Sequence, residues 1–373
     1  MIIKNGSVFN GKDFENRDIC INNGRISDKS GDARVLDAEG MYVVPGFIDI
    51  HFHGAVGCDF CDADCESLRK IAEYEAANGV LAICPATMTF GEEKLSSIIE
   101  NAVYFKSQKF DKCSDFVGIN MEGPFISRDK AGAQNPEFVL NPDFNMFNRL
   151  REKGKNLVKL VDIAPETEGA IDFIKKVSGD VVVSIAHTCA DYDISKKAFE
   201  NGASHVTHLF NAMPGINHRL PGPIIAAHEA GADVELIADG IHVHPAMVRF
   251  TFDYFGSDKV ILISDTMEGA GLPDGNYSLG GQKVIKNGKK AVLEKDINTI
   301  AGSVTNLYEC FKTVVLEMNI PVNQALKAVT INPARSIHID SEYGSLDEGK
   351  VANILVLDEK LNIKKIVLRG EVL

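Results

Sequence analysis

The sequence predicts an α/β protein in which a parallel (β/α)8 TIM barrel is combined with a small β-sandwich domain built from both chain ends. Three observations support this prediction. About eight apolar runs with strand character alternate with stretches of helical period between residues 43 and 337. Short apolar runs separated by turn residues occupy both ends of the chain. Histidines and carboxylates follow several of the central runs, which is where barrel enzymes place their active sites.

The two chain ends have the pattern of short antiparallel strands. The first 42 residues alternate apolar runs with Asn-Gly pairs, which favour tight hairpins. Residues 351–358 and 363–373 read as two further strands. Neither end is long enough to bury a sheet face alone, so we expect residues 1–43 and 338–373 to form one β-sandwich domain. The catalytic barrel domain, residues 44–337, is then inserted between them.

The central segment predicts strands and helices in alternation. The expected strands cover residues 43–50, 80–84, 116–121, 157–163, 181–186, 204–208, 233–238 and 260–264. The expected helices cover residues 66–77, 92–107, 168–177, 194–200, 245–255, 303–318 and 322–329. Continuous apolar strands between amphipathic helices are typical of a buried parallel sheet. An open, doubly wound sheet is the alternative, but the first strand lacks a glycine-rich dinucleotide loop.

One glycine-rich insertion, residues 266–295, follows the last predicted strand and contains a hairpin. In a barrel this position lies over the active face, so we expect the insertion to act as a lid.

The composition favours a small-molecule enzyme. Asp plus Glu number 52 against 39 Lys plus Arg, which gives a formal net charge of −13 and argues against nucleic acid or an anionic membrane as the main partner. No run of residues approaches the length of a membrane span, and the first residues do not resemble a signal peptide. We therefore expect a cytoplasmic protein. Its 8 cysteines are mostly scattered along the sequence, and we expect them to be reduced. Cys58, Cys61 and Cys65 are closely spaced, which we interpret as coincidental.

Histidines and carboxylates of the kind that bind metals follow six of the predicted strands. They are His51 and His53 after the first strand, Glu122 after the third, His187 after the fifth, His208 after the sixth, Asp239 and His242 after the seventh, and Asp265 after the eighth. The carboxyl ends of parallel strands meet at one face of a barrel. A histidine and carboxylate set converging there is typical of a zinc or iron site. His205 lies on the opposite face of its strand from His208, and we expect it to pack against a helix.

These residue types suggest metal-assisted hydrolysis. A divalent cation held by Glu122, His187 and His208 would lower the pKa of a bound water from 15.7 to about 7, so that hydroxide becomes available to attack an amide carbonyl. Asp265 would accept the proton of the water and then return it to the leaving amine, first as general base and then as general acid. The expected reaction is cleavage of an amide or related C–N bond.

Ten segments together resemble those of N-acetylglucosamine-6-phosphate deacetylases, a branch of the amidohydrolase superfamily. They are VVPGFIDIHFHG (43–54), MEGPFI (121–126), AGAQNP (131–136), IAPE (163–166), AHT (186–188), THLFNAM (207–213), ADGIHVHP (238–245), ISDTM (263–267), IAGS (300–303) and INPA (331–334). The resemblance covers almost the whole chain. It implies an amidohydrolase-type barrel and release of acetate from N-acetyl-D-glucosamine 6-phosphate, in amino sugar catabolism and cell-wall recycling.

The resemblance also implies roles for individual residues. It implies that Glu122, His187 and His208 bind metal and that Asp265 is the catalytic residue. Because His51 and His53 are both present, a second ion bridged by Glu122 is expected as well, which makes one or two zinc or iron ions per subunit. The residues implied to contact the substrate are Ala133, Gln134, Asn211, Ala212, Arg219 and His242.

Arg219 and Gln134 have particular implications. Arg219 resembles the arginine that meets the substrate phosphate, often from the neighbouring subunit, so a homodimer is expected. A guanidinium fork suits phosphate oxygens. Gln134 stands where some relatives have a histidine, and its amide can donate to a carbonyl oxygen but cannot carry a proton.

Two alternatives stay open from the sequence. A sibling amidohydrolase would act on another N-acyl or cyclic amide substrate, but such enzymes typically bridge two metals with a carbamylated lysine at the end of the fourth strand. Lys159 lies too early in that strand to do so. A catalytically inactive binding barrel would have lost metal ligands, whereas here the expected set is present.

Overall fold

A curved set of parallel strands forms the centre of the protein, which is described by a computed structural model over residues 1–29 and 34–373. One parallel sheet has the strand order β12-β11-β8, and a second has the order β13-β14-β15-β16-β17-β18. These strands are β8 (Phe47–Asp49), β11 (Val80–Ile83), β12 (Asp115–Phe116), β13 (Ile119–Met121), β14 (Val158–Ile163), β15 (Val182–Ile185), β16 (His205–Val206), β17 (Asp233–Ile237) and β18 (Val260–Ile263). The central strands predicted from the apolar runs are therefore confirmed.

Backbone hydrogen bonds join the two parallel sheets on two sides. On one side, Thr87 N–H donates to the carbonyl of Asn120 at 2.9 Å, next to an isolated parallel bridge between Ala86 and Asn120. On the other side, Asp265 N–H donates to the carbonyl of His51 at 2.9 Å. The first and last strands of the set therefore approach each other at their carboxyl ends.

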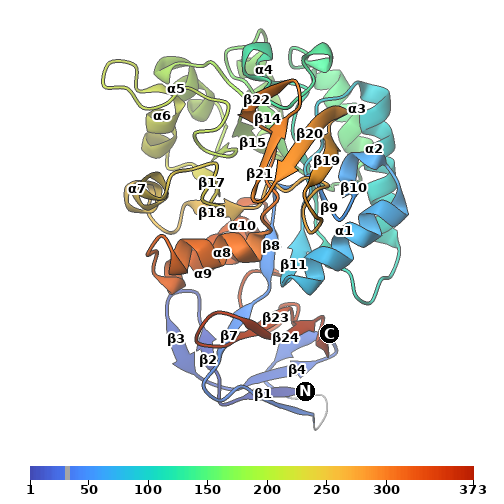
Figure 1. The fold of residues 1–373 in the computed structure, drawn as a ribbon, viewed down its shortest axis with the longest axis vertical. Coiled ribbons are helices and arrows are strands. Elements are labelled where there is room, and N and C mark those ends of the chain that lie inside the picture. Colours follow the sequence, from blue (N-terminus) through green and yellow to red (C-terminus); the bar gives the residue numbers. More distant parts are fainter. Residues whose placement is uncertain (30–33) are drawn as a thin grey trace.

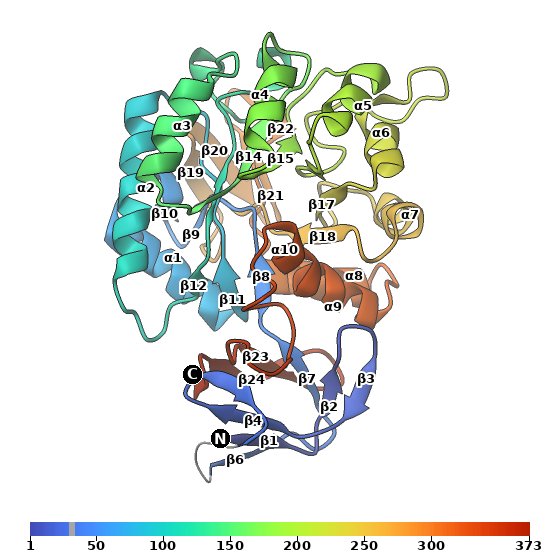
Figure 2. The same cartoon turned by 180° about the vertical axis from the view of Figure 1, so that it is seen from behind.

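Helices cover the outside of these strands (Figures 1 and 2). Those predicted are α1 (Cys65–Ala77), α2 (Glu92–Ser107), α4 (Ala170–Val177), α5 (Tyr192–Glu200), α7 (Pro245–Phe255), α8 (Leu307–Leu316) and α9 (Val322–Val329). Those not anticipated as elements are α3 (Phe144–Lys153), α6 (Gly222–Ala230), α10 (Ile331–Ser336) and the 3-10 turns η1 (Phe60–Asp62), η2 (Arg128–Lys130) and η3 (Pro136–Phe138). The helix predicted over 303–318 begins later, at Leu307, because the Asn306 side chain accepts a hydrogen bond from Glu309 N–H at 2.9 Å and caps it.

Two predicted strands are each divided in two. The first becomes β7 (Tyr42–Pro45) and β8, separated by Gly46, where a Cβ would lie 2.6 Å from Leu81 Cδ1. The third becomes β12 and β13, separated at Gly118, where a Cβ would lie 2.3 Å from Lys159 Cγ. Both breaks occur where only glycine allows the neighbouring strand to pack closely.

The chain ends lie side by side below the parallel strands (Figure 1). A six-stranded sheet has the order β25-β24-β23-β7-β2-β3, so it mixes strands from both ends, and a four-stranded sheet has the order β5-β4-β1-β6. The strands are β1 (Ile2–Lys4), β2 (Ser7–Phe9), β3 (Phe14–Asn16), β4 (Ile19–Asn22), β5 (Arg25–Ser27), β6 (Val35–Asp37), β23 (Ile354–Leu357), β24 (Ile363–Leu368) and β25 (Glu371–Val372). Both sheets contribute to one buried apolar cluster that includes Ile3, Ile21 and Val356.

The insertion after β18 is an antiparallel sheet of four strands in sequential order. They are β19 (Gly275–Leu279), β20 (Gln282–Asn287), β21 (Lys290–Leu293) and β22 (Asp296–Ile300), so the sheet extends beyond the predicted end at residue 295. A smaller hairpin, β9 (Gly54–Ala55) and β10 (Cys58–Asp59), follows β8. Among the described residues, none of the helices has the length and apolar character needed to cross a membrane.

Candidate active site

The side chains that follow the parallel strands meet at one end of the curved sheet. His51 and His53 come after β8, Glu122 directly after β13, and His187, His208 and Asp265 after β15, β16 and β18. All six residues are at most 8% exposed. The structure thus brings together the metal-binding and catalytic residues predicted from the sequence.

Three of these residues leave their strands with left-handed backbone. The φ angles are 43° at His187, 31° at His208 and 50° at Asp265. Such conformations cost of order 1–3 kcal/mol each for residues other than glycine and persist only where the surroundings fix them. Asp265 is fixed from both sides, because its N–H donates to the His51 carbonyl at 2.9 Å and its own carbonyl accepts from Ser303 N–H at 2.7 Å.

Glu122 lies at the centre of the cluster. Its Oε1 is 2.9 Å from His187 Nε2 and 3.2 Å from His208 Nε2, and these two ring nitrogens are 3.1 Å apart. Its Oε2 lies 3.2 Å from His53 Nε2 and 3.7 Å from His51 Nε2. Glu122 therefore belongs to two possible metal-binding groups, one with His187 and His208 and one with His51 and His53.

The donor set fits divalent cations. Among the described residues, His51 Nε2 and Glu122 Oε2 are buried without a hydrogen-bond partner. Several imidazoles turn Nε2 toward the same carboxylate, which is the arrangement of a histidine and carboxylate site for zinc or iron. His187 Nδ1 lies 2.8 Å from the Lys130 carbonyl, and His53 Nδ1 lies 3.3 Å from the Ala86 carbonyl. A backbone carbonyl accepts only from an N–H, so these contacts place the proton on Nδ1 and leave Nε2 free to bind a metal.

Charges within the cluster shift the pKa values of its members. Burial alone would raise the pKa of Glu122, but the charge of His51 and hydrogen bonds from His187 and His208 hold that pKa well below its usual range. Burial would lower the pKa of His53, but its hydrogen bonds to Asp265 and Glu122 raise it to about 10. Protons on the imidazoles thus balance the buried carboxylates, and a divalent cation would supply the same positive charge.

Asp265 stands beside the second group of ligands. Its Oδ1 is 3.3 Å from His53 Nε2 and 3.8 Å from His51 Nε2. Burial tends to raise the pKa of Asp265, but the hydrogen bond with His53 and the charges of His51, His53 and His208 lower it below its usual value. Asp265 is therefore ionised near neutral pH and able to accept a proton.

The cluster opens into a cavity of about 420 Å³. This volume lies within the range of about 300–1,000 Å³ common for small-molecule sites. Besides metal-binding residues and Asp265, the lining includes the predicted substrate residues Ala133, Gln134, Asn211, Ala212 and His242. Residues 298–300 of the inserted sheet line it too.

A family model described as the amidohydrolase family matches residues 42–373. The chain belongs to the amidohydrolase family. It is 33% identical, over its whole length and 93% of the relative, to an N-acetylglucosamine-6-phosphate deacetylase of Bacillus subtilis. It is 30% identical, over 90% of its length and 89% of the relative, to an N-acetylgalactosamine-6-phosphate deacetylase of Escherichia coli. The crystal structure of N-acetyl-D-glucosamine-6-phosphate deacetylase from Mycobacterium smegmatis matches all of both chains with a TM-score of 0.92 at 31% identity.

Two of the residues predicted to contact the substrate are held by hydrogen bonds. His242 Nδ1 lies 2.8 Å from Asp239 Oδ2, while Asp239 Oδ1 accepts from His242 N–H at 2.9 Å. Burial would lower the pKa of His242, but the hydrogen bond and charge of Asp239 raise it above its ordinary value. Gln134 Oε1 accepts from Thr89 N–H at 2.7 Å, which leaves the amide nitrogen as its group for a ligand.

Arg219 differs from the other residues predicted to contact the substrate because it does not line the described cavity. It lies in an exposed loop of residues 215–220, where its N–H donates to Asn217 Oδ1 at 2.9 Å. Two apolar side chains of this loop are also exposed, Ile216 at 42% and Leu220 at 72%.

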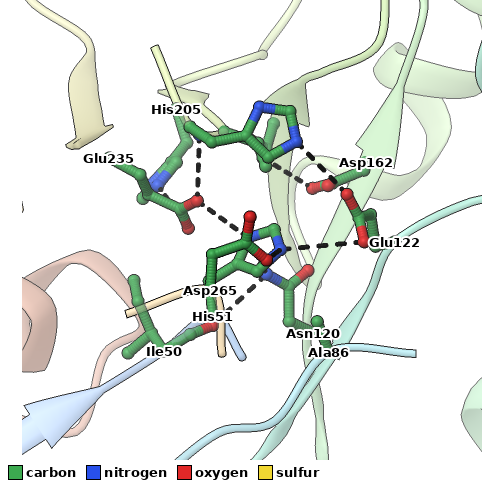
Figure 3. A network of polar contacts seen from close by, with 12 residues as sticks. Ile50, His51, Ala86, Asn120, Glu122, Asp162, His205, Glu235 and Asp265 are labelled. Atoms are coloured by element: carbon green, nitrogen blue, oxygen red, sulfur yellow. Dashed lines mark hydrogen bonds and ion pairs between the residues drawn. The ribbon is translucent and has the colours of Figure 1, made fainter. Parts of the chain in front are cut away.

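Sequence reasoning missed the polar layer beneath the ligands. Glu235, in the middle of β17, is fully buried and lies 2.9 Å from His51 Nδ1 (Figure 3). Asn120 donates to the Ile50 carbonyl at 3.3 Å in the same layer. The available signal was the acidic residue itself, because a glutamate inside the apolar run VELIA needs a buried partner. His205 packs against helix α10 as expected, with Nδ1 2.8 Å from Ser336 Oγ.

Proposed function

We propose that this amidohydrolase hydrolyses N-acetyl-D-glucosamine 6-phosphate to D-glucosamine 6-phosphate and acetate. The observation that carries the proposal is the meeting of Glu122 and four histidines beside an ionised Asp265, in a cluster that opens into one cavity. Relatives and solved structures named for this reaction share the whole chain length, which supports the choice of substrate.

The proposed reaction depends on one or two divalent cations, with zinc and iron as candidates. We assign His187, His208 and Glu122 to one ion and His51, His53 and Glu122 to the other. A bound divalent cation supplies a water of lowered pKa, near 7, and polarises the amide carbonyl. The remaining chemistry is assigned to residues of the chain.

Asp265 is the proposed general base and then general acid. Its carboxylate accepts a proton from the attacking water as the new C–O bond forms, and returns that proton to nitrogen as the C–N bond breaks. The products are acetate and the free amine. The low pKa of Asp265 and its position 3.3 Å from His53 Nε2 support this role.

Substrate recognition is assigned to groups around the cavity. Gln134 has its side-chain oxygen fixed by Thr89, so its amide N–H can donate to the acetyl oxygen. Asn211, Ala212 and Ala133 contact the sugar, and His242, whose charged form is favoured by Asp239, donates to a substrate oxygen. The inserted sheet, with residues 298–300 in the lining, acts as the lid.

The phosphate is assigned to Arg219 of a second copy of the chain, in a homodimer. Arg219 lies outside the lining of its own cavity, and exposed Leu220 and Ile216 flank it in the same loop. Exposed apolar side chains gathered in one place favour burial against a partner.

We also propose that the parallel strands close into a (β/α)8 barrel, residues 44–337, and that residues 1–43 and 338–373 form a β-sandwich domain. The backbone hydrogen bonds that join the parallel sheets on both sides support closure. The buried cluster shared by the terminal sheets supports the sandwich.

Product analysis tests the proposed function. The purified protein is incubated with the 6-phosphates of N-acetylglucosamine and N-acetylgalactosamine, and with dihydroorotate as a cyclic amide. We expect acetate and glucosamine 6-phosphate in equal amounts from the first substrate. Faster cleavage of the galactosamine compound, whose deacetylase is also a relative, would move the assignment to that sugar. Cleavage of dihydroorotate alone would overturn the proposal.

A further inference from the structure

Glu235 is a carboxylate that lies next to His51 (Figure 3) and does not line the cavity. It is located in the middle of β17 and is fully buried. Isolated carboxylates are not tolerated in such a place, because burial of an ion costs several kcal/mol unless partners compensate it. The role of Glu235 can therefore be inferred from the residues that it contacts.

Glu235 contacts one member of each metal-binding group. Its Oε2 lies 2.9 Å from His51 Nδ1 and accepts from His208 N–H at 3.2 Å. Its Oε1 lies 3.2 Å from His205 Nε2, and the other ring nitrogen of His205 is 2.8 Å from Ser336 Oγ on α10. A chain of contacts thus runs from helix α10 through His205 and Glu235 to His51.

The contact with His51 determines which ring nitrogen can bind a metal. Both oxygens of Glu235 face imidazole nitrogens, Oε2 that of His51 at 2.9 Å and Oε1 that of His205 at 3.2 Å. A carboxylate accepts from an N–H, which keeps a proton on His51 Nδ1 and leaves Nε2 for the cation. His51 Nε2 is turned to Glu122 Oε2, at 3.7 Å, and to Asp265 Oδ1, at 3.8 Å.

His51 is distinguished by this partner. The corresponding Nδ1 atoms of His53 and His187 face backbone carbonyls, those of Ala86 and Lys130. Only His51, among these three, is held by a charged group. A carboxylate behind a ligand histidine raises its basicity and fixes its orientation, and the loss of such a partner typically weakens metal binding by about 10- to 100-fold.

We infer that Glu235 is a positioning residue that orients and strengthens His51 as a ligand, so that retention of an ion by His51, His53 and Glu122 depends on it. The inference rests on the proposed metal-dependent function. Glu235 touches neither substrate nor the reacting atoms; it acts through His51.

Metal counting tests this role without an activity assay. Metal-free wild type, Glu235→Gln and His51→Ala are each titrated with Zn²⁺, and the zinc retained after dialysis is measured by elemental analysis. Glu75→Gln is the matched control, because Glu75 is also a fully buried glutamate, but without hydrogen-bond partners among the described residues. Circular dichroism establishes that each variant is folded.

We expect two zinc ions per chain in wild type and in Glu75→Gln. The ion assigned to His51, His53 and Glu122 is called the second ion, and the one assigned to His187, His208 and Glu122 the first. In Glu235→Gln the second ion should bind about 10- to 100-fold more weakly, while the first ion is retained. The double variant Glu235→Gln/His51→Ala should bind no more weakly than His51→Ala alone, since Glu235 acts through that histidine. A folded Glu235→Gln that binds both ions as tightly as wild type would overturn the inference, as would a wild type that binds one ion.

If Glu235→Gln does not fold, Ser336→Ala replaces it. This change removes the contact that holds His205 against the other oxygen of Glu235, and it should weaken the second ion by a smaller factor than loss of the carboxylate. Unchanged binding of the second ion in Ser336→Ala would then count against the inference. A wild type with two ions and no deacetylation would overturn the proposed function and leave the role of Glu235 intact.

Discussion

Replacement of Asp265 by asparagine removes the proposed acid-base group while preserving its size. The side chain lies 3.3 Å from His53 Nε2 and is held in a left-handed turn by two backbone hydrogen bonds. Those backbone bonds do not depend on the carboxylate, so the turn and the ligands around it should remain in place. Asparagine cannot accept and return a proton.

The expected loss can be estimated from the surroundings of Asp265. A positioned acid-base group contributes about 10²- to 10⁴-fold to a rate, which corresponds to about 3–5 kcal/mol of activation free energy. Among the described residues, the other buried carboxylate that lines the cavity is Glu122, whose two oxygens already face four imidazoles. It cannot take over the proton transfer. We therefore expect Asp265→Asn to reach the upper part of that range.

The assay measures kcat, KM and metal content together on purified Asp265→Asn. Asp258→Asn serves as a control, because Asp258 is a surface residue paired with Lys327 at 2.8 Å. Asp265→Asn should keep its metal and a KM near that of wild type, while its kcat falls by at least 10²-fold. A kcat within tenfold of wild type, with metal bound, would refute the acid-base assignment.

Three further predictions concern the phosphate, His242 and the metal. Arg219→Ala should lower kcat/KM for the phosphorylated sugar by about 10- to 100-fold through loss of a charge-assisted contact. Co-expression of Arg219→Ala with Asp265→Asn should restore activity if the arginine acts across the dimer, and mixed dimers no more active than Arg219→Ala itself would argue for a role within one subunit. Because Asp239 raises the pKa of His242, its charged form persists to higher pH; Asp239→Asn should therefore shift the alkaline limb of the kcat/KM profile to lower pH, and an unmoved limb would exclude this role. Removal of metal by a chelator should abolish turnover and lower Tm, since a ligand at a hundredfold excess over its Kd stabilises the folded state by about 2.7 kcal/mol; Zn²⁺ should restore both, and a chelated protein with full activity would contradict a metal-dependent reaction.

The central strands could be predicted because they are buried on both faces and appear as continuous apolar runs. Helix α6 was not listed as an element because its sequence, GPIIAAHEA, is apolar on most sides and has no amphipathic stripe to detect. Helix α10 is only six residues long and contains a proline, which gives the sequence no helical period. The breaks at Gly46 and Gly118 depend on side chains of neighbouring strands, Leu81 and Lys159, that lie far away in sequence.

Some residues of the candidate site could also be predicted from the sequence, and others could not. Residues that follow strands, such as Glu122 and His208, could be predicted because the carboxyl ends of parallel strands share one face. Glu235 could not, because its role depends on contacts from β17 to His51 and His205 on two other strands or strand ends. The position of Arg219 outside its own cavity also depends on how its loop leaves β16, which the local sequence does not determine.

Acetate release from N-acetylglucosamine 6-phosphate and from unphosphorylated N-acetylglucosamine, with metal content determined on the same sample, tests the central claim most directly. Metal-loaded protein should release acetate from the phosphorylated sugar and far more slowly from the unphosphorylated one. Metal-loaded protein that releases acetate from neither sugar would contradict the proposed deacetylation.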